Sequence, residues 1–261
     1  MNVHDFRQGI FDAAKPVLKG RKISDLVIGI SMLAVELDNK DLAVSYVLRD
    51  ELRGGCSVFG YASKAVGMDA EEAARWFVNG GDDIQRAIGG AVMTAASYGL
   101  NLKDSQRPGL PFDVELGTED TVGMIGNIRP AAMQLRKSGC KMRIFDKGSC
   151  HEGNPSEDIY PMDMQKELLP QCSVLFLSGT TTVNGTAPEI MELCNGAREV
   201  VLLGASVPMI PVGYKDRNVT VLAGSWWKHE HKAEIFRLIS QGAGMKDLSQ
   251  FAIKKNVRIK N

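Results

Sequence analysis

The densest group of side chains that could bind a ligand lies in one polar run, Ser178-Gly179-Thr180-Thr181-Thr182-Val183-Asn184-Gly185-Thr186. Hydroxyl and amide side chains cap helices, and they also donate hydrogen bonds to the carbonyl or carboxylate oxygens of ligands. Capping needs one such residue, whereas this run supplies Thr180, Thr181, Thr182 and Asn184 together. The concentration of polar groups favours a ligand-binding loop over a simple helix cap.

A second candidate is the glycine-containing turn around Gly126 and Asn127, which is followed by Pro130. Glycine lets the backbone approach a ligand, and proline suits the first turn of a helix whose N–H groups attract anions. Asp146 follows about twenty residues later, where nucleotide-binding folds place an acid on a ribose hydroxyl. Asn127 interrupts the glycine pattern, so only half of the dinucleotide fingerprint is present. A tight turn that serves packing alone is the other interpretation.

A similar pattern of small and polar residues after an apolar run, with fewer polar groups, occurs at Gly204-Ala205-Ser206-Val207-Pro208. Gly204 and Ser206 are candidate ligand contacts because they too follow an apolar run, and a simple turn is the alternative. Trp226 and Trp227 could stack on a flat ligand, although paired tryptophans more often pack in a core.

Metal ligands are offered by Cys150 and His151 in one loop and by His229 and His231 in another. Cysteine and histidine are donors for soft and borderline transition metals. On a helix, side chains two positions apart point in different directions, so the two histidines converge only in an extended segment. The alternative is that all four are solvated loop residues.

Several enzyme classes lack their motifs here. The chain has no Gly-x-Ser-x-Gly elbow, no Gly-x-x-x-x-Gly-Lys-Ser/Thr phosphate loop and no His-Glu-x-x-His helix. Serine hydrolases, P-loop NTPases and zincins are therefore disfavoured. No general base stands at a readable spacing from a partner, so the residues predict no reaction, and an enzyme and a binding protein both stay open.

The second half of the chain supplies the elements that must position these loops. Short apolar runs alternate there with helical patterns, which is typical of βαβ units in a parallel sheet covered on both faces. We expect strands at 121–125, 142–146, 173–177, 200–203 and 219–222, and helices near 131–138, 163–169, 187–195 and 228–240. In such α/β sheets ligands bind outside the carboxyl ends of the strands, so the candidate loops should meet at one edge.

The first half has a different pattern. We expect a helix over 2–18, β-rich runs over 26–37 and 42–48, and helices over 69–78, capped by Asp69, and 82–98. The polar, Pro- and Gly-containing segment 103–111 is typical of an interdomain linker. We therefore predict an α+β domain at 1–108 and a Rossmann-like domain at 109–261. The glycine pair at 89 and 90 indicates that its helix closely approaches a sheet or a ligand, and close packing alone is the other interpretation.

Composition narrows the function further. The chain has 261 residues, with 31 basic and 31 acidic side chains and a formal net charge of zero. A nucleic-acid binder would carry a basic excess. No run approaches the ~20 apolar residues of a membrane span, and no secretory signal opens the chain. The five cysteines are scattered and odd in number, unlike a disulfide framework or a zinc ribbon, so a cytoplasmic location is expected.

The order of these motifs resembles the putative heavy-metal-chelation family of bacteria and archaea, over nearly the whole chain. The resemblance is carried by Gly123-Met124-Ile125-Gly126 with Pro130, Leu169-Pro170, the run from Gly179 to Thr186, Leu203-Gly204-Ala205-Ser206-Val207-Pro208, Leu222-Ala223-Gly224 and Gln241-Gly242-Ala243-Gly244. Arg86-Ala87-Ile88-Gly89 resembles the family's usual N-terminal companion. The resemblance implies an enolase N-terminal-like domain joined to a Rossmann-like domain, with a site between them.

We therefore predict a small-molecule or metal-chelate ligand in the interdomain cleft, with a transition-metal ion as the candidate cofactor. The ligand-binding residues would be Gly126, Asn127, Asp146, Thr180, Thr181, Thr182, Asn184, Gly204 and Ser206. The metal-binding residues would be Cys150, His151, His229 and His231. Whether the protein holds metal itself or acts on a small chelator stays open, as does a homo-oligomer. The alternative is a nucleotide- or S-adenosylmethionine-dependent enzyme of Rossmann type. No nucleic-acid or membrane partner is expected.

Overall fold

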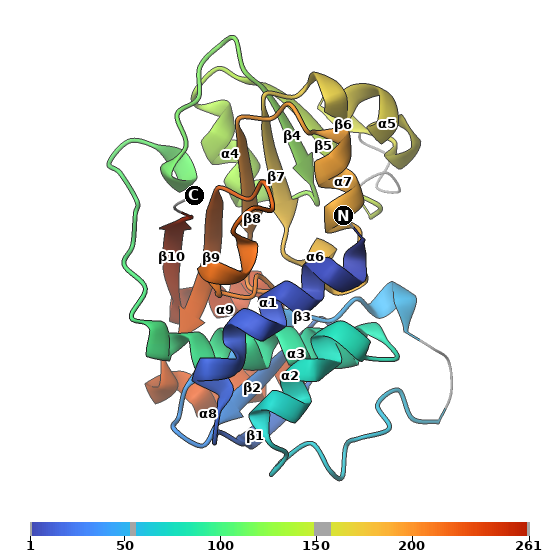
Figure 1. Ribbon diagram of the computed structural model, residues 1–261, viewed down its shortest axis with the longest axis vertical. Coiled ribbons are helices and arrows are strands. Elements are labelled where there is room, and N and C mark those ends of the chain that lie inside the picture. Colours follow the sequence, from blue (N-terminus) through green and yellow to red (C-terminus); the bar gives the residue numbers. More distant parts are fainter. Residues whose placement is uncertain (1, 53–55, 149–157, 260–261) are drawn as a thin grey trace.

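The computed structural model describes residues 2–52, 56–148 and 158–259. The chain folds as an α/β protein with two modules, each built around its own sheet (Figure 1). The N-terminal module (residues 3–100) contains a three-stranded antiparallel sheet, and the C-terminal module (residues 121–258) contains a seven-stranded, mostly parallel sheet. None of the helices in the described ranges combines the length and apolarity needed to cross a bilayer.

The N-terminal module places its helices on one face of its sheet. Its elements are α1 (Val3–Leu18), β1 (Ile23–Ile28), β2 (Met32–Leu37), β3 (Leu42–Tyr46), α2 (Ala70–Asn79) and α3 (Asp83–Ala96). Asp69 caps α2 as expected, and Asp82 caps α3. The single β-run expected over 26–37 is wrong, because the chain reverses at residues 29–31 and forms a β1–β2 hairpin. The Gly29 N–H closes this turn by donating to the Met32 carbonyl oxygen at 2.8 Å.

The C-terminal module has the sheet order β10-β9-β8-β7-β4-β5-β6, in which only β10 is antiparallel to its neighbour. Its strands are β4 (Thr121–Ile125), β5 (Lys141–Phe145), β6 (Ile159–Tyr160), β7 (Val174–Ser178), β8 (Glu199–Leu203), β9 (Val221–Trp227) and β10 (Ala252–Arg258). Its α-helices are α4 (Arg129–Arg136), α5 (Gln165–Leu168), α6 (Thr180–Asn184), α7 (Ala187–Leu193), α8 (Lys232–Ser240) and α9 (Met245–Leu248).

Short 3-10 helices connect many of these elements. They are η1 (Arg49–Glu51), η2 (Ser97–Leu100), η3 (Pro111–Asp113), η5 (Met162–Met164), η6 (Leu169–Gln171), η7 (Pro211–Tyr214), η8 (His229–His231) and η9 (Ser249–Phe251).

The five predicted strands are present, and the main differences concern one sheet edge. β9 continues to Trp227, beyond the end expected at 222, because β10 pairs with it antiparallel along its whole length. β10 itself was not anticipated, since its sequence Ala-Ile-Lys-Lys-Asn-Val-Arg is too charged for an apolar run. α8 begins at Lys232 and not at 228, because the histidine segment before it forms η8.

Residues of the two modules pack together in a shared hydrophobic cluster. The β2 strand is buried along its whole length, because both faces of the small sheet are covered. Leu33 and Val35 pack with α2 and α3, whereas Met32 and Ala34 pack in a cluster with Ile235 and Ile239 of α8. A helix of the C-terminal module therefore completes the core of the N-terminal sheet.

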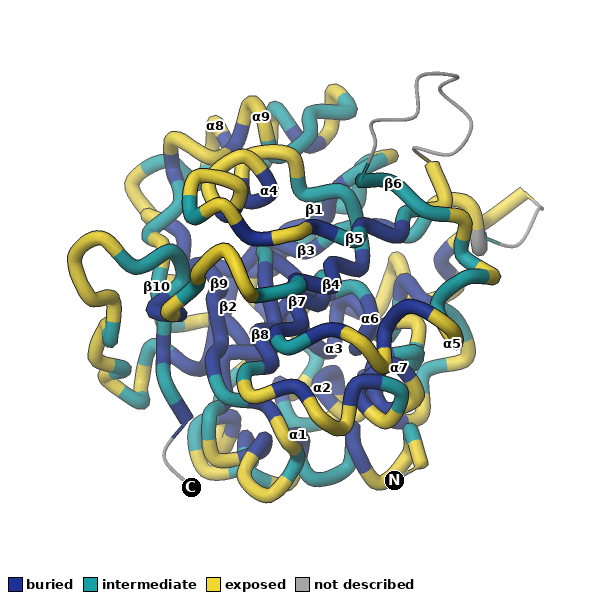
Figure 2. Tube along the Cα trace, turned by 90° about the horizontal axis from the view of Figure 1, so that it is seen from above, coloured by how far each residue is buried: buried dark blue, intermediate teal, exposed yellow. Residues whose placement is uncertain are grey.

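Helix α3 is buried between the modules, where it contacts β2 and β3 of the small sheet and α6 of the C-terminal module, and it lies near the centre of the view in Figure 2. A Cβ at Gly89 would lie 2.4 Å from the backbone N of Phe77 in α2. The expectation of close packing at this glycine is therefore confirmed. Thr94 of the same helix contacts the other module, with Oγ1 3.0 Å from the Val207 carbonyl oxygen.

Candidate functional site

A cavity of about 400 Å³ lies at the carboxyl ends of β4, β5 and β7. The chain runs from β4 outward to β5 and β6 on one side, then returns to β7 on the other side and continues to β8 and β9. The strand order thus reverses between β4 and β7. Open α/β sheets bind ligands in the crevice at such a reversal point. We call this hollow the switch-point cavity.

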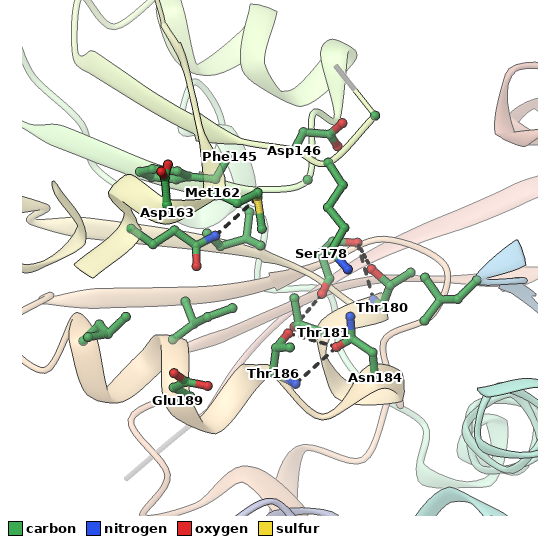
Figure 3. A pocket seen from close by; sticks show the side chains of 18 of the residues that line it. Phe145, Asp146, Met162, Asp163, Ser178, Thr180, Thr181, Asn184, Thr186 and Glu189 are labelled. Atoms are coloured by element: carbon green, nitrogen blue, oxygen red, sulfur yellow. Dashed lines mark hydrogen bonds between the residues drawn. The ribbon is translucent and has the colours of Figure 1, made fainter. Parts of the chain in front are cut away.

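One wall of the switch-point cavity is built by the Thr-rich run, which forms the short helix α6 directly after β7 (Figure 3). The Ser178 and Thr180 hydroxyl oxygens lie 2.8 Å apart, and the Thr181 hydroxyl donates to the Ser178 carbonyl oxygen at 2.7 Å. These bonds fix the side chains of the loop before a ligand arrives.

Asn184 is the last residue of α6, and its hydrogen bonds fix the orientation of its side-chain amide. Its Oδ1 accepts hydrogen bonds from the Thr186 backbone N–H at 3.2 Å and from the Thr186 hydroxyl at 2.9 Å. Two donors on one atom identify that atom as the amide oxygen, so the NH₂ group takes the other position. The amide of Asn184 lines the cavity and points toward Thr180 (Figure 3). Within the described part of the chain its Nδ2 donates no hydrogen bond, so this group can donate to a ligand.

Asp146 stands on the opposite wall, directly after β5 (Figure 3). Its Oδ2 accepts a hydrogen bond of 2.8 Å from the Asn127 backbone N–H. The turn that brings this N–H to the carboxylate requires Gly126 at φ +90°, a conformation that disfavours side chains. A Cβ at Gly126 would also lie 3.1 Å from the Cβ of Ser178. Glycine thus lets β4 and β7 approach each other at the cavity floor.

The charged lining is acidic overall. It consists of four carboxylates and two ammonium groups, from Asp50, Asp146, Asp163, Glu189, Lys147 and Lys166. Four negative charges against two positive charges leave a formal excess of two negative charges. Such a lining favours ligands that carry positive charge or hydroxyl donors.

Two arginines from the N-terminal module hold α6 from behind. Arg7 donates from Nε to the Thr182 carbonyl oxygen at 2.9 Å and from Nη2 to the Val183 carbonyl oxygen. Arg86 donates from Nε to the same Val183 oxygen at 3.1 Å and pairs with Asp83. Burial and the charge of Arg86 lower the pKa of Arg7 to about 10, which leaves Arg7 charged at neutral pH.

Sequence analysis missed Arg7 as a functional residue. The sequence carries a signal, because Arg7 stands three and four positions before Ile10 and Phe11 on the apolar face of α1. A charged side chain on the buried face of a helix needs hydrogen-bond acceptors. The Thr182 and Val183 carbonyl oxygens, near the C-terminal end of α6, are those acceptors.

Four of the predicted ligand contacts, Asn127, Thr182, Gly204 and Ser206, lie outside the cavity lining. Thr182 is fully buried, and its hydroxyl donates to the Gly179 carbonyl oxygen at 2.8 Å. Ser206 accepts hydrogen bonds from the Ser45 hydroxyl and the Tyr46 backbone N–H, each at 2.9 Å, and so joins the two modules. Gly204 forms a turn at φ +113° beside it. The cavity brings together Gly126, Asp146, Thr180, Thr181 and Asn184, and Asn127 contributes its backbone N–H to Asp146.

The predicted metal ligands do not converge where they can be placed. Cys150 and His151 lie outside the described residues. His229 Nε2 lies 2.9 Å from Glu36 Oε1, whereas His231 Nε2 lies 3.4 Å from Glu230 Oε1. Across the described ranges, no group of three or more His, Cys, Asp or Glu side chains could hold a metal ion.

The tryptophan pair serves packing. The Trp226 ring stacks on Tyr98 with centroids 4.4 Å apart, and its Nε1 donates to the Ser97 hydroxyl at 2.8 Å. Trp227 is buried in the cluster beneath α8. Neither ring lines the switch-point cavity.

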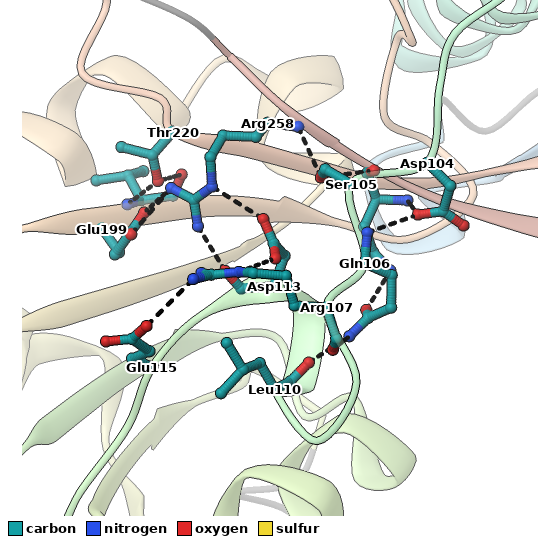
Figure 4. Close-up of polar contacts among 12 residues, drawn as sticks. Asp104, Ser105, Gln106, Arg107, Leu110, Asp113, Glu115, Glu199, Thr220 and Arg258 are labelled. Atoms are coloured by element: carbon teal, nitrogen blue, oxygen red, sulfur yellow. Dashed lines mark hydrogen bonds and ion pairs between the residues drawn. The ribbon is translucent and has the colours of Figure 1, made fainter.

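A second hollow lies near the start and end of the C-terminal module, and its lining is a set of mutually paired charges (Figure 4). Asp113 is buried and accepts from Arg107 Nε at 2.6 Å and from Arg258 Nε at 2.9 Å. Arg258 also pairs with Glu199 at 3.0 Å. These bonds tie the connection between the modules to β10, so we interpret this hollow as structural.

Comparison with known proteins gives consistent matches. Residues 110–258 match the model of a protein family described as putative heavy-metal chelation, and residues 11–97 match a second family model with the same description. An uncharacterized protein of Methanocaldococcus jannaschii is 23% identical over 193 residues, which cover 71% of this chain and 70% of that protein.

Solved structures share the fold. A crystal structure of a protein of unknown function from Pyrococcus horikoshii superposes with a TM-score of 0.75 at 19% identity, covering 97% of this chain and 100% of that chain. A protein of unknown function from Desulfitobacterium hafniense gives a TM-score of 0.73 at 19% identity, covering 96% and 98%. Both are described as members of the family matched by residues 110–258. Because that match spans more than half of the chain, the chain belongs to the family described as putative heavy-metal chelation.

Proposed function

We propose that the switch-point cavity binds a small, oxygen-rich organic chelator together with its metal ion. The observation that carries this proposal is the orientation of Asn184, whose amide oxygen is held by Thr186 and whose NH₂ group is left to donate into the cavity. An amide donor recognises carbonyl or carboxylate oxygens, which are the groups that chelators use.

The charge of the lining supports a ligand that contains a cation. Anionic chelators alone would be repelled by the acidic excess around Asp146, Asp163 and Glu189. A bound metal ion offsets the negative charge of the chelator's carboxylates. Hydroxyl groups of the chelator, or water molecules bound to the metal ion, can donate hydrogen bonds to Asp146. Because no group of three or more His, Cys, Asp or Glu side chains in the described ranges could hold a metal ion, the organic molecule would supply most of the metal's ligands.

The N-terminal module also contributes to this cavity. Leu48 and Asp50 belong to the segment that follows β3, and both line the cavity opposite the C-terminal module's loops. Arg7 and Arg86 fix α6 from the same module. A ligand bound here would therefore contact or depend on both modules, as an interdomain site requires.

A nucleotide or S-adenosylmethionine is the second candidate, and the position of Asp146 after β5 favours it. In that interpretation the carboxylate would accept from ribose hydroxyls. A dinucleotide would place its pyrophosphate at the N-terminus of the helix after the first strand, here α4. Neither Arg129 nor Pro130 lines the cavity, so the hollow does not extend to that helix end.

A thermal-shift screen separates these candidates. The full chain is heated with Ni²⁺, Zn²⁺ or Co²⁺ alone, with citrate or nitrilotriacetate alone, with each metal complex, and with ATP, NAD and S-adenosylmethionine. We expect a metal complex to raise the melting temperature more than its two components, and Asp146→Asn to remove this gain.

The Glu230→Gln variant provides a control, because it neutralises an exposed carboxylate outside the cavity. Stabilisation by nucleotides alone would favour the second candidate. Equal stabilisation of the wild type and Asp146→Asn by every compound would contradict the proposed site.

A further inference from the structure

Cys172 and Cys194 form a buried pair of thiols beneath the switch-point cavity. Cys172 follows η6 and precedes β7, whereas Cys194 ends α7. Both approach one atom, because the Leu169 carbonyl oxygen accepts from the Cys194 thiol at 2.9 Å and from the Cys172 backbone N–H at 3.0 Å. The Cys172 thiol donates to the adjacent Leu168 carbonyl oxygen at 3.5 Å, so the two thiols bond neighbouring carbonyls of one turn, and their residues are 4% and 1% exposed.

A cation stands beside this pair. Arg143 donates to the Leu168 carbonyl oxygen at 2.7 Å and to Gln171 Oε1 at 2.9 Å, which holds its guanidinium next to Cys172. The neighbouring Cys194 thiol, together with Arg143, lowers the pKa of Cys172 despite burial. The Cys172 thiol and burial raise the pKa of Cys194. The arginine beside Cys172 favours the thiolate form that binds metal ions.

We propose that Cys172 and Cys194 are a binding site for a soft, two-coordinate metal ion, held as a bis-thiolate. With Hg²⁺ as the example, two S–Hg bonds form and both thiol protons pass to solvent. The product is electrically neutral, so a buried, apolar position costs little desolvation energy. A two-thiol site selects soft ions over Zn²⁺, which requires four ligands in a structural site.

The Cys172 sulfur is closely packed, and a route leads toward Cys194 from the cavity. A Cβ at Gly123 would lie 3.2 Å from the Cys172 sulfur, so the sulfur fits there because residue 123 is a glycine. Leu193, which precedes Cys194, lines the switch-point cavity. Movement of the last turn of α7 would therefore open a path from the cavity to the thiols.

This site is independent of the proposed chelate site, because its ligands are two protein thiols and it uses neither Asp146 nor Asn184. Failure of either proposal therefore leaves the other standing. It also differs from the pair Cys150 and His151, which lies outside the described residues.

The test uses the full chain, one equivalent of Hg²⁺ and a titration with 2-mercaptoethanol, a monothiol that removes mercury from lone cysteines. Native mass spectrometry reports the mercury that is retained. We expect Cys172→Ser and Cys194→Ser to lose mercury at a competitor concentration about ten-fold or more below that needed for the wild type.

Two other cysteines provide matched controls. Cys140→Ser alters a buried thiol outside the pair, and Cys56→Ser alters an exposed one. Both should retain mercury as the wild type does. Loss of mercury from the wild type at the competitor concentration that strips the two pair variants would overturn the proposal.

A measurement on the unaltered protein keeps the test valid if a serine variant fails to fold. Trypsin should release residues 167–198 as one peptide, because no Lys or Arg lies between Lys166 and Arg198. That peptide contains both thiols and no other cysteine. We expect the mercury to remain on it, and an even distribution over the other cysteine-containing peptides would overturn the proposal.

Discussion

The Nε atom of Arg7 donates a hydrogen bond of 2.9 Å to the carbonyl oxygen of Thr182, 175 residues further along the chain. This bond joins the first helix to the back of the loop that lines the switch-point cavity. A buried charged donor must keep its acceptors, so the position of α6 depends on the N-terminal module. The site is therefore a product of both modules, although most of its lining comes from one.

Replacing Arg7 by methionine should loosen α6. The substitution leaves the Thr182 and Val183 carbonyl oxygens without this donor, and we expect a loss of about 1–3 kcal/mol in the free energy of unfolding. Faster hydrogen exchange of the amides at 180–186 would show that the effect is on this loop.

The conservative variant Arg7→Lys should recover part of the protection, because it restores a buried cation. Lys15→Met, at a half-exposed position on the same helix, serves as the control. Unchanged exchange at 180–186 in Arg7→Met would contradict the positioning role.

The parts of the site that sequence analysis predicted were local in sequence. The Thr-rich run and Asp146 were recognised from their polar groups after apolar strands, and parallel-sheet topology brings such strand ends together. Ser206 satisfied the same pattern and yet bonds Ser45 and Tyr46 of the other module. A hydroxyl after a strand looks identical whether it contacts a ligand or another segment of the chain.

Features that depend on distant pairing could not be predicted. The β10 strand is stabilised by β9 and by the bonds of Arg258, not by an apolar sequence of its own. The bond from the Cys194 thiol to the Leu169 carbonyl oxygen, next to Cys172, depends on how η6 and α7 pack, which no spacing rule encodes. By contrast, Asp69 capped its helix as predicted, because capping needs only neighbouring residues.

The paired glycines of α3 should respond oppositely to alanine. A Cβ at Gly89 would lie 2.4 Å from a backbone atom, whereas the nearest contact of a Cβ at Gly90 would be 3.5 Å. Gly89→Ala should therefore cost about 1–3 kcal/mol through overpacking. Gly90→Ala should be neutral or gain up to about 1 kcal/mol from helix propensity.

Urea unfolding measures both alanine variants. Equal stability of the two would refute the close approach of α2 and α3 at Gly89.

The buried carboxylate of Asp113 should be important for stability. It is 2% exposed and pairs with both Arg107 and Arg258. Although burial raises its pKa, the hydrogen bonds from these arginines outweigh that effect and lower it. Asp113→Asn should destabilise the protein by about 3–5 kcal/mol, because a buried charged network loses its anion.

The control is Glu115→Gln, which removes a largely exposed partner of Arg107 and should cost about 0–1 kcal/mol. Chemical denaturation measures both variants. A cost for Asp113→Asn no larger than that of the control would contradict the account of this network.

Glu36 predicts a specific pH dependence of stability. Burial raises its pKa, but hydrogen bonds from Lys232 and Ser24 more than offset this and lower it below the usual value. The lowered pKa means that the unfolded state takes up a proton before the folded state does. The stability from this group is therefore present above about pH 4.5 and is lost as the pH falls through the folded pKa.

We expect the unfolding free energy of Glu36→Gln to fall less steeply than that of the wild type as the pH decreases from about 5 to 3. Glu234→Gln, at a half-exposed position on α8, should retain the wild-type slope. Parallel curves for the wild type and Glu36→Gln would show that Glu36 does not contribute in this way.

The central claim is that the Asn184 amide donates to a chelate in the switch-point cavity, and calorimetric titration of Asn184→Asp tests it most directly. The variant retains an oxygen for Thr186 and replaces the donor by a carboxylate, while Asn195→Asp makes the same change at an exposed position outside the cavity. With the metal complex that most stabilises the wild type, we predict about ten-fold or greater loss of affinity in Asn184→Asp and none in Asn195→Asp. Equal affinity in the wild type and Asn184→Asp would contradict the claim.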